Sequence, residues 1–347
     1  MTDQQILSDD QTMSILEVLM LGVTPAISVF GVIGNIFSVI ILVKHGLHRC
    51  SNILLVSLAV NDISFLVGFN SVPKLLYEIV DRTEGFHFGR GASFVLFAFY
   101  QLCMVMDYGC GSVSLTLPVL ITAERLIAVF FPLQFNQVVT TRRTWCAVIF
   151  ISVFWYGFFI HMTFFVVLDF EMDNQLNVTV GLMKRSAYHN QNSVAVAILE
   201  EAMSYMTIQI PPLFTLAGCI VIGIKIRIAA SQRSKLTSSG QKGELSNRTT
   251  KMLMAVCTMY TAACGAMSLS TFIPQYMYYS ITSDAPSNLG KVLYQVMNIA
   301  LCLNSSCNFI IYVAMNKNFR STYMSLFRPR TSRRIDYKKS ELRKYVV

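Results

Sequence analysis

Long apolar windows that hold few charged residues recur along this chain. Each window reaches the roughly 20 residues that an α-helix needs to cross a bilayer. Only two carboxylates, Asp62 and Asp107, interrupt them. The windows are 18–43, 52–73, 91–123, 144–168, 202–224, 252–283 and 292–316. The pattern therefore predicts an all-α membrane protein that folds as a bundle of seven transmembrane helices.

The composition leads to the same class of protein. Hydrophobic residues make up 54% of the chain and charged residues only 14%, which is too apolar for a soluble protein of 347 residues. The net charge of +9 would suggest a nucleic-acid partner in a soluble protein. Here Lys and Arg are concentrated in the connections after the first, third and fifth windows and in the C-terminal tail. The positive-inside rule then accounts for the charge, so we expect no nucleic-acid partner.

The same rule places the N-terminus outside and the C-terminus inside, as in a multi-pass protein of the plasma membrane. We expect an extracellular N-terminus at 1–17, a transmembrane bundle at 18–315, a surface helix at 316–327 and a basic cytoplasmic tail at 328–347. The surface helix is expected because its aromatic residues share one side, which is typical of an amphipathic helix lying on the lipid bilayer. On the predicted outer side, Asn177 begins an Asn-Val-Thr acceptor for glycosylation.

The third window places polar residues on one face of its predicted helix. An ionisable group that faces lipid is costly, so this face must point toward other helices. We expect Asp107 to contact either a ligand or a Tyr, Gln or Asn of a neighbouring helix. The residues of this face are Asp107, Gly111, Ser114, Pro118, Ile121 and Arg125.

Short motifs in successive windows resemble those of the rhodopsin-like (class A) family of G-protein-coupled receptors. Their joint occurrence in the family's order is far more specific than any one motif. The motifs are Gly34-Asn35, Leu58 to Asp62 (LAVND), Glu124-Arg125-Leu126, Trp155, Pro211 or Pro212, and Asn304-Ser305 followed by Asn308 to Tyr312 (NFIIY).

Polar residues at mid-membrane depth form one candidate site. Each needs partners because lipid offers none. One interpretation is a hydrogen-bond network that ties helices together, and the other is a functional hydrated cluster. The resemblance implies that a sodium ion binds there in the inactive state. The candidate ligands are Asp62, Ser114, Asn304, Ser305 and Asn308.

The resemblance also implies where the receptor contacts its partners. A Glu124–Arg125 pair would hold the inactive state and release Arg125 toward a heterotrimeric G protein, together with Asn308 and Tyr312. The alternative for Arg125 is an interfacial side chain that reaches the headgroups. In amine receptors of this family an aspartate that matches Asp107 pairs with the ligand, and Cys103 and Tyr276 are further candidates for ligand contact.

The chain also departs from the family's pattern. Residues 264–269 read CGAMSL where the family has CWxP, and Phe309 replaces the proline of the seventh helix. Pro118 instead lies in the third window, where it predicts a kink. The outer loop 169–201 holds no cysteine, so the family's disulfide from helix three to that loop cannot form. In these respects the chain is similar to divergent invertebrate receptors of chemosensory and neuropeptide types.

We therefore expect a G-protein-coupled receptor for an extracellular peptide or small chemosensory molecule, with no cofactor other than the sodium ion. The alternative is a non-signalling transporter or channel, which predicts paired charges along a pathway and an internal repeat. The helix-seven window has no lysine at its middle, which excludes an opsin. The chain has no HExxH motif and its histidines are scattered, so an intramembrane enzyme finds no support.

Overall fold

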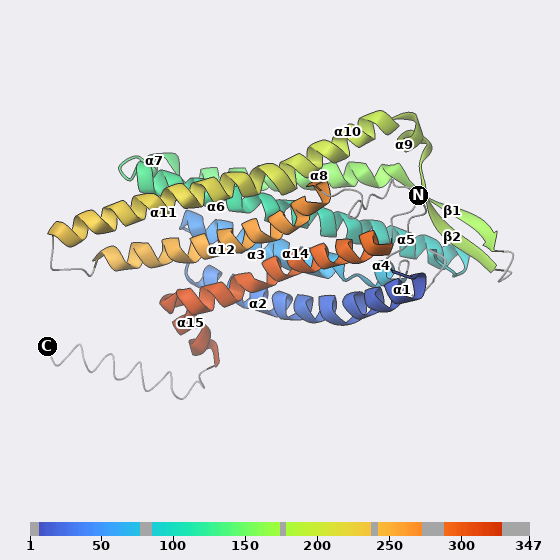
Figure 1. The fold of residues 1–347 in the computed structure, drawn as a ribbon, viewed down its shortest axis with the longest axis horizontal. Coiled ribbons are helices and arrows are strands. Elements are labelled where there is room, and N and C mark those ends of the chain that lie inside the picture. The colour runs from blue at the N-terminus through green and yellow to red at the C-terminus, as the bar shows by residue number, and fades with distance from the viewer. Residues whose placement is uncertain (1–6, 77–84, 174–177, 237–241, 273–287, 328–347) are drawn as a thin grey trace.

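The computed structural model describes residues 7–76, 85–173, 178–236, 242–272 and 288–327. Long helices run side by side along one axis (Figure 1). A two-stranded hairpin, formed by β1 (Val166–Asp173) and β2 (Val178–Arg185), marks one end, which we call the hairpin end. The helix α15 (Lys317–Phe327) turns away from the bundle at the opposite end, which we call the α15 end.

The helices group into spans that alternate in direction. The first four spans are α1 (Asp9–Glu17), η1 (Val18–Val23) and α2 (Thr24–Lys44); α3 (Cys50–Phe69) and α4 (Val72–Leu75); α5 (Arg90–Met104), η3 (Val105–Cys110) and α6 (Gly111–Phe130); and α8 (Thr141–Met162) with η4 (Thr163–Phe165). The others are α10 (Ser193–Ser204), η5 (Tyr205–Gln209) and α11 (Ile210–Leu236); α12 (Lys242–Phe272); and α14 (Asn288–Met315). Short helices α7 (Phe135–Val138) and α9 (Ala187–Gln191) lie in connections.

The predicted seven-helix membrane bundle is confirmed. Among the described residues, six helical stretches are long and apolar enough to cross a membrane. A shorter apolar stretch, Met254–Ser268 within α12, supplies the seventh. Many large apolar side chains remain exposed on the outside of the bundle, as expected of a surface that meets lipid.

Several helices extend beyond their apolar windows, because helix ends are set by capping and local sequence as well as by the bilayer. The first helix begins at Asp9 instead of at residue 18. Ser8 and Gln11 form a capping box at this start. Helices α11 and α12 likewise extend into the connection between the fifth and sixth windows, reaching Leu236 and starting at Lys242.

The β-hairpin is an element that the sequence reasoning missed. Its strands pair in antiparallel register from Val166 opposite Arg185 to Asp173 opposite Val178. Phe86, which precedes the third span, extends the hairpin by one bridge. Its N–H donates to the Gly181 carbonyl across 2.9 Å, and the Gly181 N–H donates back across 3.0 Å.

The hairpin is also tied to the start of the third span. The Ser93 hydroxyl, on α5, donates to the carbonyls of Phe86 and Phe88 at 3.3 and 3.0 Å. The Arg90 guanidinium lies 5.6 Å from the centre of the Phe170 ring. All nine cysteines are free. Backbone pairing and these contacts therefore position the two strands of the hairpin without the disulfide that the resembled family uses.

Candidate functional site

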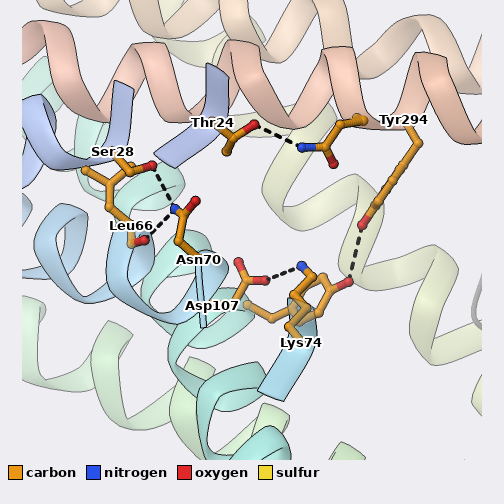
Figure 2. A network of polar contacts seen from close by, with 9 residues as sticks. Thr24, Ser28, Leu66, Asn70, Lys74, Asp107 and Tyr294 are labelled. Carbon is orange, nitrogen blue, oxygen red and sulfur yellow. Dashed lines mark hydrogen bonds and ion pairs between the residues drawn. The ribbon is translucent and has the colours of Figure 1, made fainter. Parts of the chain in front are cut away.

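A buried ion pair joins the second and third spans in the hairpin half of the bundle (Figure 2). The Lys74 ammonium on α4 lies 3.3 Å from the Asp107 carboxylate on η3. Only 7% and 6% of the two side chains are exposed. The ammonium also lies 4.1 Å from the centre of the Phe69 ring, within the range of a cation–π interaction.

A break in the second span positions Lys74. Helix α3 ends at Phe69, and α4 begins at Val72 with Pro73 in its first turn, where a missing N–H costs no hydrogen bond. The third span approaches the second span closely at Gly68 of α3. A Cβ atom at Gly68 would lie 2.8 Å from the backbone nitrogen of Asp107. The absence of a side chain at Gly68 therefore allows the two spans to bring their charges together.

Asp107 has a partner inside the protein that the sequence reasoning missed. The sequence left open a ligand or a Tyr, Gln or Asn of a neighbouring helix, and contact with a ligand stays a prediction. The structure pairs Asp107 with Lys74. The available signal was the apolar run that continues past Lys74 as Leu75-Leu76, which places the lysine inside a hydrophobic segment.

Further hydrogen bonds tie four spans together around this pair (Figure 2). The Tyr108 and Tyr294 hydroxyls lie 3.3 Å apart and connect the third span to the seventh. Gln295 donates to Thr24 across 3.0 Å, and Asn70 donates to Ser28 across 2.7 Å. The first, second, third and seventh spans thus meet at one polar site in the hairpin half.

The other candidates for ligand contact have different outcomes. Cys103 is buried on α5, beside Ser71 and close to Asp107. Tyr276 lies outside the described residues, and so does the glycosylation candidate Asn177. The structure therefore brings Cys103 and Asp107 together at the ion pair.

A second polar cluster lies deeper in the bundle, around Asp62. Asn308 on α14 donates to the Asp62 carboxylate across 2.8 Å, and the hydroxyls of Ser114 and Ser305 face the same carboxylate. Asn35 on α2 donates to the Ser305 carbonyl across 2.8 Å. Four spans therefore contribute to the cluster, as the sequence pattern predicted for its polar residues.

The cluster retains unused oxygen acceptors that suit a hard cation. Asp62 Oδ1, Ser114 Oγ and Asn35 Oδ1 are buried and have no hydrogen-bond partner among the described residues. Buried polar atoms without partners are rare in proteins, and hard cations prefer oxygen ligands. The donor set therefore fits a sodium ion. Asn304, the remaining candidate ligand, is buried on α14.

A third cluster, at the α15 end, contains Glu124 and Arg125. The Arg125 guanidinium lies 3.7 Å from the Glu124 carboxylate. Ser51, at the start of α3, bridges the two. Its hydroxyl donates to Glu124 across 2.8 Å and accepts a hydrogen bond from Arg125. The sequence reasoning missed Ser51 because its partners are distant in the chain.

The bundle is closely packed beside Arg125. The cavity that Arg125 lines with residues of α6, α11 and α12 has a volume of about 10 Å³. This space holds at most about one water molecule. The described residues around this cavity therefore leave room for about one water molecule beside Arg125.

Phe309, which replaces the proline of the resembled family, packs at the junction of the first span, the seventh span and α15. A Cβ atom at Gly34 would lie 2.9 Å from the Phe309 Cβ, so the glycine allows this close approach. The Phe309 ring lies 5.2 Å from the Tyr323 ring and 6.0 Å from the Phe319 ring. Tyr312, the candidate for G-protein coupling, is buried and its ring lies 5.5 Å from that of Phe319.

Comparisons with known proteins agree with this architecture. Residues 22–330 match the family model described as serpentine type 7TM GPCR chemoreceptor Srw. The chain is 23% identical to the FMRFamide receptor of Drosophila melanogaster, over 87% of the chain and 52% of that receptor. The match thus spans about half of that receptor's length. The chain is also 24% identical to trace amine-associated receptor 365 of Petromyzon marinus, over 88% of the chain and 78% of that protein.

Proposed function

We propose that this chain, which belongs to the serpentine type 7TM GPCR chemoreceptor Srw family, binds an extracellular ligand at its hairpin end. We propose further that it activates a heterotrimeric G protein at its α15 end. The match to the family covers residues 22–330. The matched family and relatives are receptors, and none of them is named as an enzyme, a transporter or a channel. We further assign the chain to the rhodopsin-like class, on the motifs of its helices.

One observation carries the proposal. The third span holds a charged cluster near each end, Asp107 with Lys74 in the hairpin half and Glu124 with Arg125 and Ser51 near the α15 end. A single helix therefore connects the two ends of the bundle. A ligand that moves this helix at one end would change the packing around Arg125 at the other, which is how a receptor biases two arrangements of its helices.

The hairpin end is the side that we propose faces the outside of the plasma membrane, with the N-terminus. It carries the acidic residues Asp9 and Asp10, and also Asp169 and Glu171, which share the Lys184 ammonium. The excess of carboxylates would attract a cationic ligand. Two relatives are named for FMRFamide and for association with trace amines. We propose a peptide, or else a small chemosensory molecule, as the ligand.

The inactive state is proposed to rest on two clusters. Asp62, Ser114, Asn304, Ser305 and Asn308 would hold a sodium ion, whose charge would balance the buried Asp62 carboxylate. Glu124 and Ser51 would hold Arg125 until activation releases it toward the G protein, with Asn308 and Tyr312 repacking beside it. The small cavity beside Arg125 supports the assignment of the structure to the closed state.

The test is G-protein dissociation in cells that express the chain while peptides, amines and odorants are applied. We expect a ligand-dependent or basal signal that Arg125→Ala removes. Arg142→Ala is the matched control, because Arg142 is an exposed arginine near the same end of the bundle. A chain that reaches the cell surface, produces no G-protein signal and carries solute or ion flux would contradict the proposal.

A further inference from the structure

We infer that Cys219, Cys257 and Met254 form a binding site for a single copper(I) ion between α11 and α12. The three residues line the small cavity beside Arg125. The site is separate from the Asp107 ion pair and from the polar cluster around Asp62. An ion bound there would join the fifth span to the sixth through the protein's own sulfur atoms.

Sulfur-containing side chains from two helices meet at this cavity. Cys219 belongs to α11, and Met254 and Cys257 belong to α12. Met254 and Cys257 are three residues apart, a spacing that places both on the same face of a helix. The Cys219 and Cys257 thiols are close enough to interact with each other. The Cys257 sulfur also lies 3.6 Å from the Thr122 hydroxyl on α6. The fold therefore gathers three sulfur-containing side chains around one space.

The size and burial of the cavity limit what can bind there. Its volume is about 10 Å³, which is room for about one water molecule or a single ion. Only 9% of Cys219 and 2% of Cys257 are exposed. Ile121 and Ile222, which are also buried, form apolar parts of the wall. An ion bound here would therefore take its ligands from the protein and have no space for water ligands.

The chemistry of the ligands selects the ion. Thiolate and thioether ligands favour soft ions such as copper(I), whereas magnesium, calcium and manganese prefer oxygen ligands. Structural zinc sites draw four ligands from Cys, His, Asp and Glu. Among the described residues, no group of three or more such side chains could hold a metal ion. Two thiolates and one thioether, without a position for water, therefore suit copper(I) better than zinc.

Arg125 provides a positive charge beside the same cavity. Its Nε is buried and has no hydrogen-bond partner among the described residues, and its ion pair with Glu124 is long, at 3.7 Å. Binding of copper(I) would release the two thiol protons and leave a complex with a net negative charge. A buried charge is costly unless it lies near an opposite charge. Arg125 would therefore stabilise the copper-bound form of the site.

The test titrates the purified full-length receptor with the coloured copper(I)–bicinchoninate complex under reducing, oxygen-free conditions. A protein that takes copper from this complex removes its colour, so the loss of colour reports the amount and the affinity of binding. We expect the wild type to bind one more copper ion than Cys219→Ser or Cys257→Ser. Cys307→Ser is the matched control, because Cys307 is a half-buried free cysteine of α14 that does not line the cavity. It should bind copper like the wild type.

Met254→Leu tests the third ligand and remains informative if a cysteine variant fails to fold. Leucine retains an apolar side chain of similar size and lacks the thioether. Loss of even an outer-shell partner lowers metal affinity about 10- to 100-fold, so loss of this ligand should weaken copper binding at least about tenfold. X-ray absorption by the copper-loaded wild type should show sulfur as the only neighbour of the ion.

Three results would overturn the inference. The first is equal copper binding by the wild type and by a folded Cys219→Ser or Cys257→Ser variant. The second is a copper ion with nitrogen or oxygen neighbours in the loaded wild type. The third is an unchanged affinity in Met254→Leu. None of these measurements needs a G protein, so a receptor that failed to couple would contradict the proposed function and leave the copper site intact.

Discussion

The Tyr260 hydroxyl on α12 donates a 2.6 Å hydrogen bond to the backbone carbonyl of Leu115 on α6. Tyr260 is fully buried, with 1% of its surface exposed. Leu115 lies one turn before Pro118, where the helix lacks a backbone N–H. The contact joins the third and sixth spans in a region where the tryptophan of the resembled family's sixth helix is missing.

We predict that Tyr260→Phe raises basal G-protein activation. The change removes one buried hydrogen bond worth about 1 kcal/mol and leaves the ring in place. If the bond favours the closed bundle, the active fraction should rise about fivefold. The measurement is basal G-protein dissociation normalised to surface expression. Thr258→Ala is the control, because the Thr258 hydroxyl donates, among the described residues, to the Met254 carbonyl of its own helix. Equal basal signals in Tyr260→Phe and the wild type would mean that the contact is structural only.

Ser51→Ala should also raise basal activation, because Ser51 bridges Glu124 and Arg125. The remaining ion pair is long, at 3.7 Å, so the bridge supplies much of the restraint on Arg125. We expect a severalfold increase for the loss of about 1 kcal/mol. Ser152→Ala, whose hydroxyl bonds within α8, should leave basal dissociation unchanged. A basal signal that matches the wild type would show that Arg125 needs no such bridge.

Gly181→Val should loosen the hairpin from the bundle. A Cβ atom at Gly181 would lie 3.2 Å from Leu168 and 3.3 Å from Ser93, so a branched side chain forces the strands apart or breaks the bridge to Phe86. Overpacking of this kind costs about 1–3 kcal/mol. Hydrogen exchange at residues 166–172 and 178–185 should accelerate. Gly89→Ala has open space around its new methyl group and should exchange like the wild type. Unchanged protection in Gly181→Val would contradict the proposed anchoring.

Acidification should weaken the contact between α15 and the end of the first span. His45 Nε2 lies 2.9 Å from the Thr322 hydroxyl. Burial, together with the charges of Arg49 and Lys44, lowers the pKa of His45 below its usual value. The folded state therefore favours the neutral ring. The stability that this gives is present above about pH 6.5, the pKa of histidine in the unfolded chain. It is lost as the pH falls from there through the lower pKa of the folded state.

The measurement is the unfolding temperature of the wild type and of His45→Gln at about pH 7.5 and about pH 5.5. The glutamine side chain of the variant cannot titrate, so the variant should lose less stability on acidification than the wild type. The same pH dependence in both proteins would assign the effect to other groups.

Sodium should lower basal signalling if Asp62 binds the ion in the inactive state. Replacing choline with sodium in the assay should reduce basal G-protein dissociation by the wild type and have no effect on Asp62→Asn. Asp169→Asn is the control, because Asp169 is an exposed carboxylate that pairs with Lys184 on the hairpin. Sodium sensitivity that persists in Asp62→Asn would place the ion elsewhere.

The spans could be predicted from sequence because the bilayer imposes a length and an apolar composition on each one. The polar cluster at Asp62 could be predicted for the same reason, since polar groups at mid-membrane depth must meet one another. The partner of Asp107 could not be predicted from the sequence. A lysine just past an apolar window is expected to reach the headgroups, and only the break at Asn70 and Ser71 turns Lys74 inward.

The hairpin and the Tyr260 contact were missed for a different reason. The segments 166–173 and 178–185 are rich in β-branched and apolar residues, but the bridge that anchors them joins Gly181 to Phe86, far away in the chain. Tyr260 lies in an apolar helix where one aromatic residue has no distinguishing pattern. Both depend on partners that only the fold brings together.

The π-helical turns of the first, third and fifth spans have a consequence for insertions and deletions. Among the described residues these turns are η1, η3 and η5, all in the hairpin half. A π turn holds one residue more than the α-helical turn it replaces. Deleting one residue from Val105–Cys110 would restore a regular α-helical turn and leave the side chains before and after it on nearly the same faces of the span. The spacing that keeps side chains on one face of these spans is therefore one residue longer across the π turn than in the α15 half.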